Sequence, residues 1–198
     1  MEATANWQLF LGGDKNALSL IFISHYDDLY NYGLKLCGKE DVVKDAVQDL
    51  FLKLWKNKAN LKPILSVKPY LFKSLRHHIH DSIELQKSYV QIDNDSDDSI
   101  FEVTYSHEDF LINNQVKEDI KKKVIKALNE LTSRQREAIY LRYFEELEFE
   151  TIAIIMETNV QSVRNTIYRG MEVMRDFMLA EVFFIMSGKV SLTLEKFF

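Results

Sequence analysis

Glycine and proline are scarce along this chain, and that scarcity constrains its fold more than any other feature. Only 6 Gly and 2 Pro occur in 198 residues. An all-β fold needs frequent turns, where these two residue types concentrate, so the sequence disfavours it. Hydrophobic residues make up 46% of the chain and charged residues 28%, which is enough apolar material to bury real cores. We therefore predict an all-α protein of long helices joined by short loops, with length enough for two domains.

Cysteine content and hydropathy exclude further classes. The single cysteine, Cys37, rules out a disulfide framework and any multi-cysteine zinc or iron–sulfur site. The start of the chain lacks the apolar core of a signal peptide. The apolar run near the other end, residues 182–186, falls far short of the roughly 20 residues that span a bilayer. We expect a cytoplasmic protein without a membrane span.

The net charge of −5 is distributed unevenly. Residues 1–83 carry a net charge of +2 and residues 120–198 a net charge of +1, whereas residues 84–119 carry −8. This middle segment contains the run DNDSDD and lacks apolar periodicity, as is typical of a flexible linker. The acidity of the chain therefore resides in a predicted linker at 86–119, and the two ends can still contact DNA.

Helical periodicity is clear before the linker. Between residues 42 and 55, apolar side chains alternate at spacings of one and three, which marks one face of a helix. An earlier helix is expected at about 16–36, and Pro69 favours the start of a helix that runs through Leu75. Residues 1–85 are therefore predicted to form a helical bundle.

The second half has the pattern of a helix-turn-helix. Thr132 is a suitable N-cap for a helix that reaches Tyr143. A short helix is predicted at 149–156, a turn at 157–159 and a longer helix at 160–178. In that last helix, a stripe at spacings of three and four should face the core: Val160, Val163, Ile167, Met171 and Met174.

The opposite face of this last helix carries side chains that suit a DNA major groove. Arginine can bond guanine in a bidentate way, glutamine and asparagine can bond adenine, and hydroxyl groups can hold phosphate. An ordinary solvated helix face is the alternative. The residues are Gln161, Ser162, Arg164, Asn165, Tyr168 and Arg169.

Two separate motifs resemble those of bacterial sigma factors. Residues 127–144, ALNELTSRQREAIYLRYF, resemble the start of their region 4, and the similarity continues through residues 160–165. Residues 45–55, DAVQDLFLKLW, resemble their region 2 helix, and residues 70–76 resemble the segment after it. Both motifs occur in the family's order on either side of a linker. The layout resembles the extracytoplasmic-function (ECF) group of the sigma-70 family, which has regions 2 and 4 only.

The resemblance implies partners for named residues. Region 2 would dock on the β′ coiled coil of core RNA polymerase through Asp45, Gln48, Asp49, Leu52, Lys53 and Trp55. Its next helix would meet the opened −10 element through Lys73, Arg76, His77 and His78. Region 4 would contact the β flap and read the −35 element through Gln161, Ser162, Arg164, Asn165, Tyr168 and Arg169.

Three positions depart from the family pattern. His77 stands where the family usually has Asn, and Glu84 stands where it usually has an arginine that meets DNA. Glu157 occupies the turn, where Gly is usual, so either its backbone is left-handed or the turn differs. Asn159 remains a suitable N-cap for the helix that follows. We hypothesise that autonomous promoter reading is weakened and that a DNA-bound recruiter delivers the factor. Ordinary variation within a working family member is the alternative.

Other chemistry finds little support. Residues 33–40, GLKLCGKE, nearly fit a phosphate-binding loop but end in Glu instead of Ser or Thr. His77, His80 and Asp81 share a helical face without a second ligand-rich segment. We predict no enzyme, no cofactor and no metal.

The predicted protein is thus an initiation factor with four parts. They are a region 2-like domain at 1–85, the linker at 86–119, a region 4-like domain at 120–179 and an apolar tail at 180–198, which folds back or docks a partner. The expected partners are core polymerase and promoter DNA, with an anti-sigma factor or a recruiter. Two alternatives remain: a helix-turn-helix regulator, and a sigma-fold adaptor that binds polymerase without reading DNA.

Overall fold

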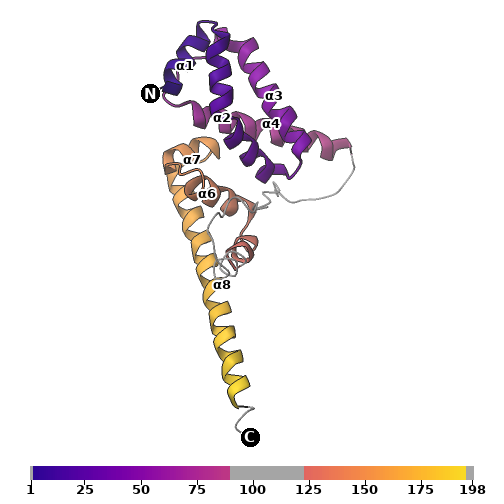
Figure 1. Cartoon of the computed structure of the whole chain (residues 1–198), viewed down its shortest axis with the longest axis vertical. Coiled ribbons are helices and arrows are strands. Elements are labelled where there is room, and N and C mark those ends of the chain that lie inside the picture. The colour runs from indigo at the N-terminus through magenta and orange to yellow at the C-terminus, as the bar shows by residue number, and fades with distance from the viewer. Residues whose placement is uncertain (1, 90–122, 195–198) are drawn as a thin grey trace.

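The computed structural model describes residues 2–89 and 123–194, and these residues form helices and short connections (Figure 1). The predicted all-α class is confirmed over this part of the chain. In chain order the helices are α1 (Glu2–Leu11), α2 (Lys15–Cys37), α3 (Glu40–Asn57), the short 3₁₀ helix η1 (Lys58–Asn60), α4 (Val67–Tyr89), a helix at residues 123–129, α6 (Ser133–Tyr143), α7 (Phe149–Ile155) and α8 (Val160–Leu194).

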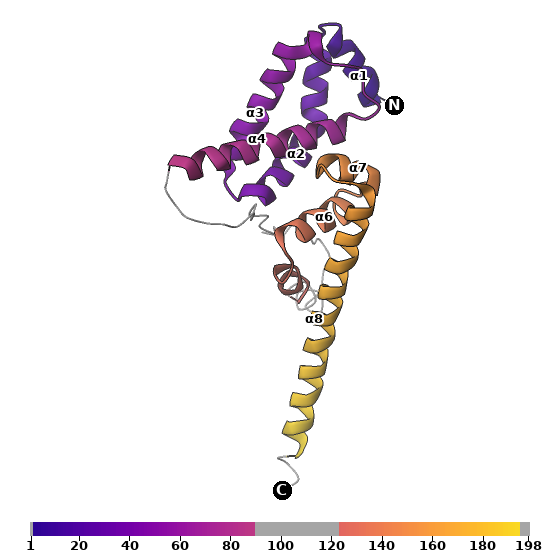
Figure 2. The same cartoon turned by 180° about the vertical axis from the view of Figure 1, so that it is seen from behind.

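The N-terminal domain packs α2, α3 and α4 against one another, with α1 closing one end of the bundle (Figure 2). The predicted helices at 16–36 and 42–55 are confirmed, each slightly longer than expected. Helix α1 was not predicted. Its Trp7 and Phe10 are fully buried, with ring centroids 5.2 Å apart, and the Trp7 indole N–H donates to the Lys62 carbonyl at 3.2 Å. These contacts, rather than a helical pattern, fix α1 in the bundle.

Local signals define both ends of α2. The Asp14 carboxylate accepts the backbone N–H groups of Asn16 and Ala17 at 2.8 and 3.3 Å, which caps the first turn. Gly38 ends the helix at φ 64°, a left-handed conformation that glycine adopts without steric cost. The segment 33–40 that nearly fits a phosphate-binding loop is therefore the end of α2 and the start of α3. A Cβ at Gly33 would lie 2.7 Å from the Val43 side chain, so this glycine serves helix packing.

The C-terminal domain contains the predicted helix-turn-helix. Thr132 caps α6 in a reciprocal capping box with Gln135, as its position predicted. Helices α7 and α8 follow at nearly the predicted bounds, but α8 continues to Leu194, well past the expected end at 178. The first part of the apolar tail is thus a continuation of α8 that extends away from both domains (Figure 1).

The two domains lie against each other, with α4 in contact with α7 (Figure 2). One continuous cluster of buried residues includes Leu75 and Ile79 of α4 together with Leu141 and Ile152 of the second domain. Most of the predicted acidic linker, residues 86–119, lies outside the described residues. Within the part of the chain that is described, no helix is both long and apolar enough to cross a membrane.

Helix α1 gives a direct test of this packing. Trp7→Ala removes a fully buried aromatic side chain and should lower the free energy of unfolding by about 3–5 kcal/mol. Leu9→Ala, on the same helix but 54% exposed, should change it by less than about 0.5 kcal/mol. Urea denaturation followed by circular dichroism measures both. Equal effects of the two substitutions would show that α1 is not packed as described.

Candidate polymerase and nucleic-acid interfaces

The turn of the helix-turn-helix has a strained backbone. Glu157 has φ 51°, so the left-handed alternative raised by the sequence is the one that occurs. A non-glycine residue in this region costs about 1–2 kcal/mol. Asn159 then caps α8, because its side-chain oxygen accepts the Ser162 N–H at 2.8 Å, as predicted. The turn therefore starts α8 at a fixed position and direction relative to α7.

The N-terminal half of α8 presents its polar residues outward. Val163 and Ile167 are buried, as the periodicity predicted, but Met171 is 41% exposed, so the expected apolar stripe is incomplete there. The later turns of α8 extend beyond α6 and α7 (Figure 1). Five of the six predicted DNA-reading residues are exposed and Ser162 is partly buried; the exposed ones are Gln161, Arg164, Asn165, Tyr168 and Arg169.

Neighbouring side chains orient part of this face. The Gln161 amide donates to the Asn165 side-chain oxygen at 3.0 Å. The Arg164 guanidinium lies over the Phe149 ring at 5.3 Å, and Arg142 lies over the same ring at 4.8 Å. The first residue of α7 thus brings two arginines together, and Arg142 is a basic residue here that sequence reasoning did not select.

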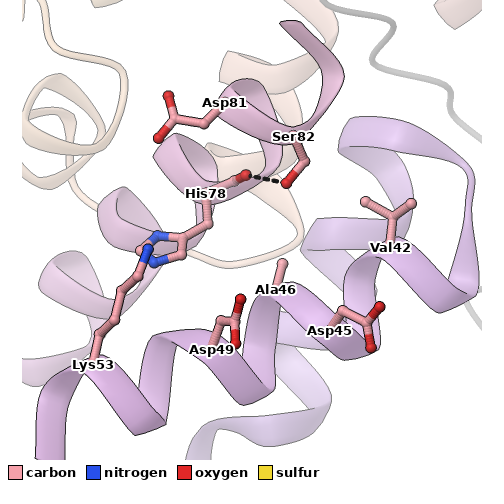
Figure 3. Close-up of a pocket in the computed structure, with 8 residues that line it drawn as sticks. All are labelled: Val42, Asp45, Ala46, Asp49, Lys53, His78, Asp81 and Ser82. Atoms are coloured by element: carbon pink, nitrogen blue, oxygen red, sulfur yellow. Dashed lines mark hydrogen bonds between the residues drawn. The ribbon is translucent and has the colours of Figure 1, made fainter. Parts of the chain in front are cut away.

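The predicted polymerase-docking residues of α3 line two separate hollows. Asp45, Asp49 and Lys53, one helical turn apart from each other, border a cleft of about 390 Å³ between α3 and α4 (Figure 3). Its other wall includes His78 and Asp81 of α4.

The second hollow is apolar and lies between α2 and α3. Gln48, Leu52 and Trp55 line it, together with Phe22 and Phe51, whose rings meet edge to face at 5.0 Å. Leu52 is an apolar side chain on the polar face of α3 and is 47% exposed. The α2 side of this groove was not selected from the sequence. The apolar residues of α2 are spread around several faces of the helix, so its sequence gave no pattern that singled out the aromatic side chains of this groove.

Three of the four predicted −10 residues contact the other domain. Lys73 Nζ lies 3.0 Å from one Glu157 oxygen, and His77 Nε2 lies 3.1 Å from the other. The hydrogen bond from Lys73 lowers the pKa of Glu157, and the charge of His77 lowers it further. Burial raises this pKa by less, so it stays below its ordinary value. His78 is separated from them: its Nδ1 lies 2.7 Å from the Ser74 carbonyl, and its ring lines the cleft of Figure 3.

The remaining basic side chain of this group, Arg76, meets a buried carboxylate. Its Nε and one terminal nitrogen donate to the two oxygens of Glu137 at 2.9 and 3.5 Å, and the Tyr32 hydroxyl donates to the same carboxylate at 2.6 Å. Burial opposes the charge on Arg76, but the attraction and hydrogen bond of Glu137 outweigh it and raise the Arg76 pKa. Burial, reinforced by Glu137, raises the pKa of Tyr32 well above its usual value.

A further bridge joins the domains at the start of α4. Lys68 Nζ lies 2.9 Å from both Asp28 of α2 and Glu145, which follows α6. The Tyr140 hydroxyl also donates to Glu145, at 2.7 Å. Sequence reasoning selected none of Tyr32, Lys68, Glu137 and Glu145, because their partners lie in distant segments and leave no local pattern.

Comparison with known families decides what kind of protein carries these surfaces. A family model described as sigma-70 region 2 matches residues 21–88, and one described as sigma-70 region 4 matches residues 121–174. The chain belongs to the sigma-70 family. It is therefore a non-enzymatic transcription initiation factor, and α3 and α4 lie in its region 2 while α6, α7 and the first half of α8 form its region 4.

Curated relatives place this sigma factor in the ECF group. It is similar to the RNA polymerase sigma factor SigV of Bacillus subtilis, at 27% identity over 161 residues, which cover 81% of this chain and 90% of the relative. It is also similar to the ECF RNA polymerase sigma factor SigM of the same organism, at 23% identity over 150 residues, which cover 76% of this chain and 88% of the relative.

Solved structures share the fold of this sigma factor. One is CnrH in complex with the cytosolic domain of CnrY, with a TM-score of 0.62 and 16% identity over 91% of this chain and 99% of that one. Another is the sigma factor RpoE in complex with the anti-sigma factor NepR from Bartonella quintana, with a TM-score of 0.60 and 23% identity over 81% of this chain and 95% of that one.

Among the described residues of this sigma factor, no three His, Cys, Asp or Glu side chains gather as a metal site would require. The Glu84 side chain, a departure from the family pattern, lies outside the described residues.

The pKa of Glu157 tests the contact between regions 2 and 4. Because Lys73 lowers it, we expect Glu157 to titrate below the ordinary value of 4.5 in the native protein. The ion pairs then contribute fully above that ordinary value and are lost as the pH falls through the lowered one. Carbon-13 NMR titration of the carboxyl group measures this. In Lys73→Ala the Glu157 pKa should rise toward 4.5, and an unchanged value would contradict the contact.

Proposed function

We propose that this ECF sigma factor binds core RNA polymerase through α2 and α3 and directs it to promoters that α4 and α8 recognise. The observation that carries the proposal is the outward polar face of α8 at the end of a capped helix-turn-helix. A helix placed in this way can enter a major groove, and its exposed Gln, Arg and Asn side chains are those that bond base edges. We assign this face to the −35 element.

The apolar groove between α2 and α3 is the proposed core of the polymerase interface. It offers Leu52 and Trp55 beside the aromatic side chains of α2, and its rim carries Gln48 and Lys44. Aromatic and apolar anchors inside a polar rim are the usual composition of protein interfaces. A helical coiled coil, such as that of the β′ subunit, suits a groove between two helices. The neighbouring cleft with Asp45, Asp49 and Lys53 would extend this contact along α3.

Lys73, Arg76 and His77 of α4 are proposed to meet the opened −10 strand, where basic side chains attract phosphates and unstacked bases. We also propose that this factor by itself reads promoters weakly and that a DNA-bound recruiter delivers it to them. The support is that Lys73, Arg76 and His77 already form ion pairs with Glu137 and Glu157. Phosphates must therefore compete with carboxylates that are already bound.

Regulation by an anti-sigma protein fits the same surfaces. In one solved structure of similar fold, the sigma factor RpoE is in complex with the anti-sigma factor NepR. A protein that covers the apolar groove of this chain would block polymerase binding without touching α8.

Leu52 tests the polymerase interface. Leu52→Glu places a charge in the centre of the groove and should weaken binding to core polymerase by at least about 10-fold. Leu65→Glu makes the same change at a side chain that is 99% exposed in another part of the domain, and should leave affinity within about 2-fold. Fluorescence titration with labelled protein measures both. Equal affinities for the two variants would move the interface away from this groove.

Run-off transcription on genomic fragments tests the function as a whole. With core polymerase and this protein, defined start sites are expected, but with weak signal in the absence of other factors. Strong, specific initiation from the protein alone would overturn the weakened-reading proposal. Silence with clear co-elution would favour dependence on a recruiter, or the adaptor alternative if no partner restores activity. Specific duplex binding without co-elution would favour the helix-turn-helix regulator.

A further inference from the structure

The apolar groove between α2 and α3 has lysine side chains at its two ends. The groove has a volume of about 450 Å³. Lys44 lines one end, about three helical turns along α3 from Trp55. Lys15 and Lys58 lie against Trp55 at the other end. None of the described residues that line this groove carries a carboxylate, so the groove is apolar inside and basic at its rim.

Two ammonium groups lie against the indole ring of Trp55. Lys58 Nζ is 4.0 Å from the ring centroid and Lys15 Nζ is 5.7 Å from it, and both distances are within the range of a cation–π contact. Lys58 Nζ also donates to the Trp55 backbone carbonyl at 3.3 Å, which fixes its position. Lys15 begins α2, Trp55 lies near the end of α3, and Lys58 begins η1. The tertiary fold therefore brings three separate elements together at this end of the groove.

The two ends of the groove differ in how their charges are balanced. Lys44 forms an ion pair with Glu40 at 3.1 Å. Within the part of the chain that the structure describes, neither Lys15 nor Lys58 forms an ion pair with a carboxylate. Two cations held close to one ring without an anion produce a positive potential there, which attracts a negative group. The Trp55 end is therefore the stronger site for an anion.

The cleft between α3 and α4 has the opposite charge. Asp45 and Asp49 line it from α3 and Asp81 lines it from α4, together with the single cation Lys53 (Figure 3). α3 therefore separates a groove with a basic rim from a cleft with an acidic lining. A partner that lies across α3 must bring a negative group to one side and a positive group to the other, so its charges match in only one orientation.

We propose that Lys15 and Lys58 form a carboxylate-binding site at the Trp55 end of the groove, and that a Glu or Asp side chain from a helix of core polymerase occupies it. The proposal rests on the polymerase-binding role proposed above for this groove. The apolar face of that helix packs on Leu52 and Phe22, and its carboxylate reaches the two ammonium groups. Docking excludes water from the rim, which strengthens the attraction between these charges.

Half of this site lies outside the part of the chain that matches region 2. The region 2 model begins at residue 21, whereas Lys15 precedes it and is the first residue of α2. The carboxylate of Asp14 caps that first turn and so places Lys15 relative to α3. The site is therefore a feature of this chain, and it selects a partner helix by charge as well as by apolar shape.

The first test measures the affinity of the full chain for core polymerase by fluorescence titration. Lys15→Gln/Lys58→Gln removes both charges of the site and should weaken binding about 10-fold. The control, Lys62→Gln/Lys126→Gln, removes two positive charges from exposed positions outside the groove and should bind within about 2-fold of the native chain. Equal affinities of the two variants would overturn the proposal.

Two synthetic helices test which charge the site accepts. Both are amphipathic peptides of about 18 residues with the same leucine stripe, and one end carries either glutamates or lysines. The native chain should bind the glutamate peptide about 10-fold more tightly than the lysine peptide, because the site attracts carboxylates. Lys15→Gln/Lys58→Gln should lose this preference and the control variant should keep it. No preference in the native chain, or an equal preference in the site variant, contradicts the proposed site.

The two tests separate this site from the proposed function. If the native chain does not bind core polymerase, the proposed sigma activity is refuted, whereas the peptide comparison still decides whether the site takes a carboxylate. A changed peptide preference with unchanged affinity for core polymerase overturns the assignment of the helix to polymerase. If the double variant loses its helical circular dichroism, Lys15→Gln alone replaces it, because Lys15 is exposed. An unchanged peptide preference in that variant then overturns the proposal.

Discussion

The arrangement of this molecule depends on one buried carboxylate. Glu137 is 1% exposed and accepts hydrogen bonds from Arg76 and Tyr32, both of the other domain. Such a pair is worth little against a well-packed apolar contact, but loss of one partner leaves an unpaired buried charge that costs about 3–5 kcal/mol. We therefore infer that this contact fixes how the two domains are oriented more than it stabilises them. It joins α4 to region 4 at a buried position, and Lys68 and Lys73 make further contacts with region 4 from the same helix.

The two proposed nucleic-acid surfaces differ in what determines their accessibility: α8 packs within its own domain, whereas α4 also packs against the other domain. The polar face of α8 is set by residues of its own domain: Val163 and Ile167 bury the opposite face, and Asn159 fixes the first turn. That face stays outward whether or not the domains touch. The accessibility of α4 depends on its neighbour, because the carboxylates that pair with Arg76 and Lys73 come from region 4. A change in domain arrangement can thus alter the proposed −10 face of α4 and leave the proposed −35 face of α8 intact.

Glu157 illustrates how one position serves several constraints. The turn between α7 and α8 needs a left-handed residue, and the chain places a non-glycine residue there despite the steric cost. The hydrogen bonds that it accepts from Lys73 and His77 lower its pKa, so its charge persists to a lower pH than that of an ordinary glutamate. The same side chain therefore forms part of the turn of the helix-turn-helix and also contacts α4, the helix proposed to meet single-stranded DNA.

The sequence by itself determined the helical class, the approximate bounds of α2, α3 and α7, the caps at Thr132 and Asn159, and the outward face of α8. These features depend on residues one to four positions apart, whose relative placement is set by the geometry of a single helix or turn. Only the tertiary structure decided the length of α8, the burial of α1 and the meeting of Tyr32 with Glu137 across 105 residues. A pair so distant in sequence leaves no periodic signal, because its geometry exists only after both domains have folded and packed together.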